Sequence, residues 1–597
     1  MKALRTTAVI LGVVSLLGVA QARVASTNTH GRIFVLMVWD GLRPDFVTRD
    51  WTPSLYQLEH AGVEFAHQHA IFPTMTIANA AALATGTGPG GNGIYADDVY
   101  FAPLLRARRL ASGGLLMDEN VKLESSRTLA ALNGTRAFDG RLLGLETIAQ
   151  RIEHSGGYLA IIGKAGPTFL FDDAVAEPAR AGGHNYLFVA DDLSEPSSLK
   201  LPPEQPSKLN WKNWHSVAAR DAWFTDLVIS RALPSAKAQA IQDKNALIVF
   251  WQHDPDLVQH AAGLGTSPAL HALAACDHNL ARIRAAIKAY GIAGRTDLMV
   301  VSDHGFSTIR ANVTLADLLV AAGLKQSQDS DDLVISRDGG ADLLYLSHAR
   351  FKTRQQRRDI LQRVVDYAEA QPWCGPIFSK AGNGNGAIAG SFGQRLLGLY
   401  NPARSPDLII SFRAFPDQSN QGLTGPHNPG VTIGGKYASR HGPNESSTLV
   451  HPVEGVIYSD SADLMDPHKG FTTGMGMHGA AGERDLHNFC AAYGPDFREG
   501  FVDQEPSGNT DIAPTIALLM HEAPMAGVTG RILREALADG GASKGTAQPL
   551  TMTSRLQLPT GTVTMRLMLS RYDGREYLDG SSVTHTPAAA VHRAAKH

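Results

Sequence analysis

Four uninterrupted apolar runs constrain the fold of this chain more than any other feature of the sequence. They are residues 33–39 (IFVLMVW), 158–162 (YLAII), 246–251 (ALIVFW) and the LMVV within the predicted strand 297–302 (DLMVVS). Such runs are typical of strands buried on both faces, as in a parallel sheet covered by helices. Helix-like segments lie between them; the one at 267–291, for example, begins with Ser-Pro and ends near a glycine. This alternation predicts an α/β fold with a doubly wound, mostly parallel sheet sandwiched by helices.

The segments outside these runs suggest how the chain is divided. Residues 1–22 have the basic start, the apolar run and the Ala-Gln-Ala ending of a secretory signal peptide, and the run is shorter than the roughly 20 residues that span a bilayer. Polar stretches at 106–141 and 178–210 are interpreted as loops or small lobes added to the sheet. The expected units are a signal peptide at 1–22, the α/β core at 23–308 and 440–543, a cap-like insertion at 309–439, and a small β appendage with a disordered tail at 544–597.

Composition and charge limit the partners of the chain. Of its 597 residues 44% are hydrophobic, which is enough for a large core. The formal net charge of −3 gives no electrostatic case for binding a nucleic-acid polymer or an anionic membrane. We therefore expect an exported protein, periplasmic or secreted, that has no membrane association once the signal peptide is removed. The three cysteines are too few for a disulfide framework, although one disulfide between Cys374 and Cys490 is an alternative. The sequence does not indicate the oligomeric state.

Acidic and histidine residues follow the predicted strands. In open α/β sheets ligands bind outside the carboxyl ends of the strands. Taken singly, each residue has an ordinary interpretation as a turn residue, a helix cap or a surface histidine. Together, three aspartates and three histidines make two ligand sets that suit Zn²⁺, and a metal pair can clamp the oxygens of an in-line displacement. The candidates are Asp40, Asp256, His260, Asp303, His304 and His478.

Residues 72–86 (FPTMTIANAAALATG) predict an extended segment that turns into a short helix at Thr76. Pro73 disfavours a helix before it, the alanine-rich run favours one after it, and Gly86 ends it. A hydroxyl at a helix start lies near free N–H groups and the positive end of the helix dipole, which suits a phosphoryl group. The ordinary alternative is that Thr76 or Asn79 is only a helix cap. Metal coordination is one recognised way to activate a threonine hydroxyl as a nucleophile.

In their order and spacing these motifs resemble the alkaline phosphatase superfamily, and most closely its type I phosphodiesterase/nucleotide pyrophosphatase family. The resemblance implies an alkaline phosphatase-like fold and a phosphoric ester hydrolase that cleaves phosphodiester or nucleotide pyrophosphate bonds. Its substrate would be a small phosphate ester, with nucleotides among the candidates. The matching segments are residues 35–46 (VLMVWDGLRPDF), 52–86, 254–263 (DPDLVQHAAG), 300–307 (VVSDHGFS), 477–501 and 511–520.

The resemblance also implies two Zn²⁺ per chain and a role for each candidate. Thr76 would be the nucleophile and would form a covalent phosphothreonine. One zinc would be surrounded by Asp40, Thr76, Asp303 and His304, and the other would be held by Asp256, His260 and His478. The family pattern prefers these residues to their neighbouring competitors, which are Thr74, His253, Asp254 and His441.

Asp97 is the departure from the family pattern that bears on the substrate. It falls where the nucleotide pyrophosphatase branch has an asparagine that donates to a phosphoryl oxygen, whereas an ionised aspartate cannot donate and repels that oxygen. Asp97 is therefore protonated, or it points away, or the substrate differs; we favour the last two.

The sequence also bears on several alternative functions. A sulfatase needs a Cys or Ser nucleophile, whereas residues 76–80 read TIANA. A phosphomonoesterase or a phosphonate hydrolase of the same superfamily stays an alternative. An inactive binding protein is the alternative from another class, but it would be expected to have lost Thr76 or a metal ligand.

Overall fold

The computed structural model describes most of the chain. The predicted signal peptide, the end of the predicted tail and much of both polar stretches lie outside the described residues. Within the described part, no helix combines the length and the apolar character needed to cross a bilayer. The described residues are 31–100, 121–133, 142–172, 185–195, 214–380, 382–423, 449–461, 471–541, 543 and 545–588.

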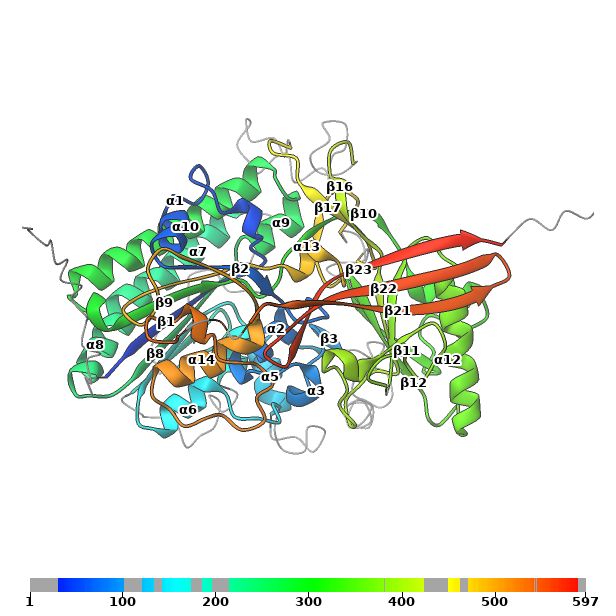
Figure 1. The fold of residues 1–597 in the computed structure, drawn as a ribbon, viewed down its shortest axis with the longest axis horizontal. Helices are drawn as coiled ribbons and strands as arrows, with labels where there is room; N and C mark the ends of the chain where they lie inside the picture. Colours follow the sequence, from blue (N-terminus) through cyan, green and yellow to red (C-terminus); the bar gives the residue numbers. More distant parts are fainter. Residues whose placement is uncertain are drawn as a thin grey trace, which may run out of the picture.

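A nine-stranded sheet forms the centre of the molecule (Figure 1). Its strand order is β20-β2-β19-β9-β1-β8-β5-β6-β7. Five adjacent strands, β9, β1, β8, β5 and β6, run parallel, and the four predicted apolar runs are the first four of them. β19 and β7 pair antiparallel with their neighbours, which makes the sheet mixed. The predicted α/β fold class is confirmed. The strands are β1 (Ile33–Trp39), β2 (Val63–His69), β5 (Tyr158–Gly163), β6 (Tyr186–Ala190), β7 (Ser194–Glu195), β8 (Ala246–Gln252), β9 (Thr296–Val301), β19 (Cys490–Tyr493) and β20 (Phe501–Gly508).

Alternation along the strands separates two apolar layers. On β1, Phe34, Leu36 and Val38 belong to one layer, whereas Ile33 and Met37 belong to the other. Helices cover both layers, which explains why these strands are apolar on both faces. The first layer contains residues of α2 (Thr76–Thr85), α6 (Ile148–His154) and α14 (Ile512–Leu519), and the second contains residues of α1 (Pro53–Ala61), α7 (Trp214–Leu227), α8 (Leu233–Ile241) and α10 (Ser267–Ala289).

One sequence interpretation was wrong. The stretch 178–210 was expected to be a loop or lobe, but it contains β6, which pairs in parallel with β5 inside the main sheet. The strand is only YLFVA, and its polar surroundings hide it. The three cysteines are buried and unpaired, so no Cys374–Cys490 bridge forms.

Further sheets lie beside the core (Figure 1). Much of 309–439 forms a five-stranded sheet with helix α12 (Arg354–Glu369), and the domain division itself stays a prediction. The five strands are β11 (Leu333–Asp338), β12 (Ala341–Leu346), β15 (Leu408–Phe412), β13 (Cys374–Ser379) and β14 (Phe392–Gly393). A four-stranded sheet contains β16 (Ala414–Ser419), β17 (Glu454–Ser459), β10 (Ser307–Asn312) and β18 (Gly476–Met477).

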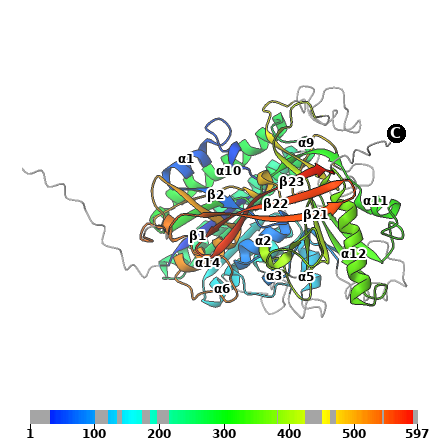
Figure 2. The same cartoon turned by 45° about the vertical axis from the view of Figure 1, so that its right-hand side comes forward.

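The C-terminal sheet bridges the core and the five-stranded sheet. Its strands are β21 (Gln548–Leu558), β22 (Gly561–Tyr572) and β23 (Arg575–Pro587). β23 contacts β2, β20 and α13 (Glu483–Leu486) on the core side, and it contacts β13 on the other. Figures 1 and 2 show the three long strands crossing the molecule between these two parts.

Candidate active site

The carboxyl ends of the central strands bring the predicted aspartates together. Asp40 follows β1 directly, Asp303 lies two residues beyond β9, and Asp256 opens helix α9 (Asp256–Ala262). All three side chains are buried. Gly41 adopts φ 68° directly after Asp40, and its N–H donates to Asp303 Oδ1 at 3.0 Å. This edge is where open α/β sheets bind ligands.

Thr76 is the first residue of α2, and the preceding loop holds it beside these carboxylates. Asn79 fixes that loop, because its Oδ1 accepts from the Ile71 N–H at 2.8 Å and its Nδ2 donates to the Met75 carbonyl at 3.1 Å. The Thr76 Oγ1 lies 3.1 Å from Nε2 of His304. The hydroxyl therefore has the predicted position at a helix N-terminus.

The three predicted histidines are all fixed in the same tautomer. In His260, His304 and His478, Nδ1 lies 2.9, 2.9 and 2.8 Å from a backbone carbonyl oxygen, respectively. A carbonyl only accepts, so Nδ1 carries the proton and the Nε2 lone pair is free. Backbone carbonyls orient metal-binding histidines in this way. Burial lowers the pKa of His304 to about 4 and holds the pKa of His478 well below its usual value, so both rings are neutral at pH 7.

Each of the three aspartates has one satisfied and one unsatisfied oxygen. Among the described residues, no hydrogen-bond donor reaches Asp40 Oδ1, Asp256 Oδ1 or Asp303 Oδ2, although all three atoms are buried. These oxygens face the histidine Nε2 atoms. Asp256 Oδ1 lies 3.2 Å from His260 and 3.5 Å from His478, and Asp303 Oδ2 lies 3.3 Å from His304.

Buried oxygens that face nitrogen lone pairs repel one another unless a cation lies between them. The donors present are carboxylate and imidazole groups, which are ligands for borderline divalent metals. Ligand atoms within each of two triads lie within 4.8 Å of one another, and both triads use Asp256. The site therefore fits divalent cations. The triads are Asp256, His260 and His478, and Asp40, Asp256 and His304.

Lys164 is a site residue that the sequence analysis missed. It follows β5 directly, and its Nζ lies 2.7 Å from Asp40 Oδ2 and 3.4 Å from Asp256 Oδ2. Burial alone would lower the pKa of Lys164, but the two carboxylates outweigh burial and hold it well above its usual value. The signal was present, because Lys164 lies two residues beyond the predicted run at 158–162, at the same end of the sheet as Asp40.

Electrostatics distinguish the aspartates. Burial raises the pKa of Asp40 to about 6, and burial together with the charge of Asp40 raises the pKa of Asp303 well above its usual value. Burial would also raise the pKa of Asp256, but Lys164 and His260 outweigh it and hold that pKa well below its usual value. The raised pKa values of Asp40 and Asp303 favour their protonated forms, and a divalent cation would displace these protons.

Two of the predicted competitors have structural roles instead. The Thr74 hydroxyl donates to the Ala480 carbonyl at 3.2 Å and accepts from Gly479 N–H at 2.9 Å, which ties the Thr76 loop to the segment after His478. The competing His441 lies outside the described residues.

His253 is the second competitor with a structural role. Its two ring nitrogens lie 2.8 Å from Asp221 Oδ1 and 2.7 Å from Asp191 Oδ2. Its neighbour Asp254 is buried and belongs to neither of these two triads of described residues.

Asp97 lines the same cavity as Thr76. The cavity has a volume of about 120 Å³. Asp97 Oδ1 accepts from the Ile77 N–H at 2.8 Å, so this carboxyl group caps the first turn of α2. Burial, reinforced by the charge of Glu124, raises the pKa of Asp97 well above its usual value. The other polar residues around the cavity are Asp98, Lys122, Glu124, Lys164, Arg337 and Asp338.

Comparisons with solved structures support the fold. A structure of murine ectonucleotide pyrophosphatase/phosphodiesterase 5, an inactive threonine-to-alanine variant in complex with AMP, aligns with a TM-score of 0.51 and 15% identity, covering 85% of this chain and 100% of that one. A second structure of the same murine protein has a TM-score of 0.49 at the same identity and coverage. At this identity the similarity shows the fold alone. No curated protein matches the chain.

The sequence model of one family settles the membership. The model for type I phosphodiesterase/nucleotide pyrophosphatase matches residues 34–413, which is more than half of the chain. The match contains Thr76, the carboxyl ends of β1, β8 and β9, and Lys164. The predicted resemblance is confirmed. The chain therefore belongs to the type I phosphodiesterase/nucleotide pyrophosphatase family and is a phosphoric ester hydrolase.

Proposed function

We propose that this protein is an exported, two-zinc phosphodiesterase or nucleotide pyrophosphatase that acts through a covalent phosphothreonine at Thr76. One observation carries the proposal: among the described residues, three unsatisfied carboxylate oxygens face the Nε2 atoms of three histidines, and the Thr76 hydroxyl lies 3.1 Å from one of these nitrogens, that of His304. Export is inferred from the signal-peptide pattern of residues 1–22.

The ligands divide between two sites in this proposal. Asp40, Thr76, Asp303 and His304 would hold one ion, and Asp256, His260 and His478 would hold the other. When bound, the two ions supply Lewis acidity, which lowers the pKa of nearby hydroxyl groups and neutralises charge on phosphoryl and leaving-group oxygens.

The chain's own residues then carry the reaction. Thr76 attacks phosphorus as the alkoxide, so that the bond from Oγ1 to phosphorus forms while the bond from phosphorus to the leaving oxygen breaks. Water subsequently attacks the phosphothreonine, which restores the hydroxyl and releases the phosphoryl product. Asn79 and Thr74 hold the Thr76 loop in place during both steps. Lys164 keeps Asp40 and Asp256 oriented and adds positive charge beside the reacting phosphoryl group.

Asp97 acts as a neutral donor in this proposal. Its Oδ1 accepts from the Ile77 N–H, and burial together with the charge of Glu124 raises its pKa, which favours a proton on the other oxygen. A protonated carboxyl group donates to a phosphoryl oxygen as an asparagine amide would. This inference selects the protonated alternative, although the sequence analysis favoured the other two.

The substrate is proposed to be a nucleotide ester or another small phosphodiester. The support is the family membership and the AMP named for the murine structure. The test is a comparison of kcat/KM on zinc-loaded protein, with the p-nitrophenyl ester of thymidine 5′-monophosphate, bis-(p-nitrophenyl) phosphate and p-nitrophenyl phosphate as substrates. We expect both diesters to be strongly preferred and EDTA to abolish hydrolysis. A preference for the monoester would make the protein a phosphomonoesterase, and no hydrolysis of any ester would overturn the proposal.

A further inference from the structure

A second group of metal-ligand residues lies away from the catalytic cavity. His69, His487 and Asp579 each offer one ligand atom, and these three atoms lie within 4.8 Å of one another. His69 ends β2, His487 follows α13, and Asp579 belongs to β23. The group therefore joins three segments that are far apart in the sequence.

Hydrogen bonds orient two of these side chains from behind. His69 Nδ1 lies 2.9 Å from the Ser507 carbonyl, so Nδ1 carries a proton and Nε2 points toward Asp579 Oδ1 at 2.9 Å. The Ser570 hydroxyl donates to the other oxygen of Asp579, Oδ2, at 2.9 Å. Support of this kind, with a carbonyl behind the histidine and a hydroxyl behind the carboxylate, is typical of metal ligands.

The short contact between His69 and Asp579 indicates a positive charge between the two groups, carried either by a metal ion or by a proton on Nε2. With Nδ1 protonated, the Nε2 lone pair of a neutral His69 would face a carboxylate oxygen at 2.9 Å, which is repulsive. A proton on Nε2 would give a simple ion pair, but it would leave His487 without a role. The His487 ring lies 4.5 Å from the His69 ring between centroids, and its nitrogens have no hydrogen-bond partner within the described ranges. A metal ion would use all three side chains.

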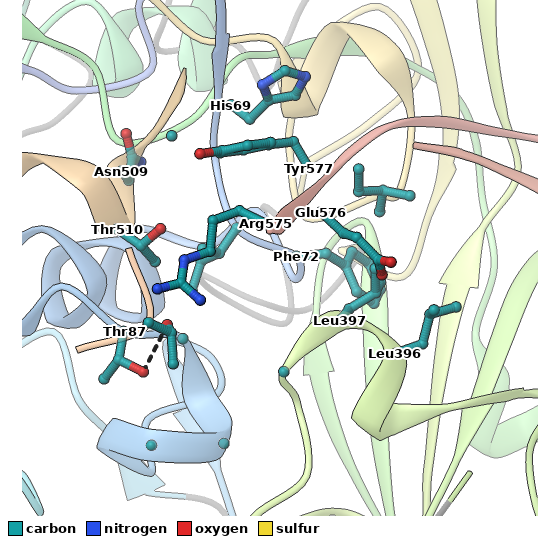
Figure 3. A pocket seen from close by; sticks show the side chains of 18 of the residues that line it. His69, Phe72, Thr87, Leu396, Leu397, Asn509, Thr510, Arg575, Glu576 and Tyr577 are labelled. Atoms are coloured by element: carbon teal, nitrogen blue, oxygen red, sulfur yellow. Dashed lines mark hydrogen bonds between the residues drawn. The ribbon is translucent and has the colours of Figure 1, made fainter. Parts of the chain in front are cut away.

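A cavity lies beside one of the three proposed ligands, His69. His69 and Tyr577 line a cavity of about 610 Å³, and Figure 3 shows their rings side by side at one end of it. Tyr577 is not a candidate ligand, because its hydroxyl donates to Asp511 Oδ2 at 2.8 Å. Among the described residues, this cavity and the catalytic cavity have no lining residue in common.

We propose that His69, His487 and Asp579 bind a further divalent metal ion, separate from the active site, which fastens the C-terminal sheet to the catalytic core. Two imidazoles and one carboxylate with an open position make a ligand set for Zn²⁺. The anchor points lie close to the catalytic segments in the chain. His69 precedes Thr76 by seven residues, and His487 follows His478 by nine. The Ala70 N–H also donates to the Leu486 carbonyl at 2.7 Å, so the two core segments are already in register.

The test compares zinc content among variants of the full chain. Wild type, His487→Ala and Asp579→Asn are equilibrated with Zn²⁺, passed through gel filtration and measured by mass spectrometry of the metal. His67→Ala is the matched control, because this exposed histidine lies on the same strand, two residues before His69. We expect His487→Ala and Asp579→Asn to bind one zinc fewer per chain than wild type and the control. Equal zinc content in all four proteins would overturn the proposal.

A second readout separates a metal site from a simple ion pair. Asparagine at position 579 keeps a hydrogen bond to His69 Nε2 but loses the carboxylate ligand. We expect added Zn²⁺ to raise the Tm of wild type by more than it raises that of Asp579→Asn. If the contact is only an ion pair, the substitution lowers the Tm equally with and without zinc. Because the test uses differences between proteins, it holds whatever number of ions the active site binds.

Discussion

The two Asp/His clusters of this protein use the same groups under different constraints. In both, a backbone carbonyl fixes Nδ1 of a histidine and turns Nε2 toward a carboxylate. In the catalytic cluster three buried carboxylate oxygens are unsatisfied, whereas in the outer cluster Ser570 and His69 occupy both oxygens of Asp579. The catalytic cluster thus concentrates more uncompensated carboxylate charge than the outer cluster, which contains a single carboxylate. We infer that the first is arranged for reactivity and the second for attachment.

The largest expected difference between the clusters is in catalysis. Asp256→Asn removes the carboxylate that both catalytic triads share, so we expect kcat/KM for a diester to fall by roughly 10³-fold or more, because charge stabilisation is usually the largest catalytic contribution. Asp579→Asn should change it by no more than about twofold, because surface substitutions away from the site have small effects. Steady-state kinetics at saturating zinc measure both. Equal losses in the two variants would mean that the clusters are not functionally distinct.

A smaller loss is expected when the lysine of the catalytic cluster is removed. Lys164→Met deletes the ammonium between Asp40 and Asp256. We expect kcat/KM to fall by roughly 10- to 100-fold, the usual effect of removing a group that orients metal ligands. Zinc affinity should stay equal or rise, because a competing positive charge is gone. Lys288→Met, on an exposed position of α10, is the control. Weaker zinc binding in Lys164→Met would contradict this role.

Asp40 and Asp579 should change the free energy of unfolding in opposite directions as the pH rises. The pKa of Asp40 is raised to about 6, so without metal its contribution to folding stability is present at low pH and is lost as the pH rises through 6. For Asp579 without metal, burial would raise the pKa, but the contact with His69 outweighs burial and lowers it, so the contribution of Asp579 to stability is present at neutral pH and is lost in acid. Denaturant unfolding of metal-free wild type and Asp40→Asn between pH 4.5 and 7.5 measures the first effect. The same slope in both proteins would contradict it.

The pH dependence of zinc affinity also reports on the protons bound by Asp40 and Asp303. Because the cation displaces protons from Asp40 and Asp303, we expect the apparent affinity of the catalytic cluster to rise as the pH increases through about 6. Calorimetric titration at two pH values in buffers of different ionisation heat measures the proton release. An affinity independent of pH between 5 and 7.5 would contradict the assignment.

The smallest effect is expected at Asp97. If its neutral carboxyl group donates to the phosphoryl oxygen, Asp97→Asn keeps the donor, and kcat/KM at pH 7 should stay within about threefold because the amide replaces that hydrogen bond. The alkaline decline of the wild-type pH profile should weaken, because an amide does not ionise. An increase in diester hydrolysis of about tenfold or more would instead mean that Asp97 is ionised and repels the substrate.

The sequence predicted the elements that follow from local pattern. The four apolar runs became adjacent strands, and Thr76 begins its helix where Pro73 and the alanine run placed it. Asp40, Asp256 and Asp303 were predicted to meet because each follows a predicted strand, and they lie close together in the structure. β6 was not predicted, because a five-residue strand in a polar stretch shows little hydrophobic periodicity.

Tertiary contacts explain what else the sequence did not reveal. His69, His487 and Asp579 follow no common rule, because they meet only when β23 docks beside β2 and α13. The raised pKa of Asp97 depends on burial and on Glu124, whose proximity no spacing in the chain indicates. Lys164 differs from these cases. It lies at the carboxyl end of a predicted strand, where ligands bind, but only aspartates and histidines were considered as metal ligands.

The central claim is that Thr76 carries the phosphoryl group during turnover. The most direct measurement is acid quenching of the zinc-loaded protein during hydrolysis of the p-nitrophenyl ester of thymidine 5′-monophosphate, followed by peptide mass spectrometry. Thr76→Ala is the control, and its zinc content should stay near that of wild type. We predict a thymidylyl adduct on the peptide that contains Thr76 in wild type, with neither adduct nor turnover in Thr76→Ala. Full turnover by Thr76→Ala, or an adduct on another residue, would contradict the account.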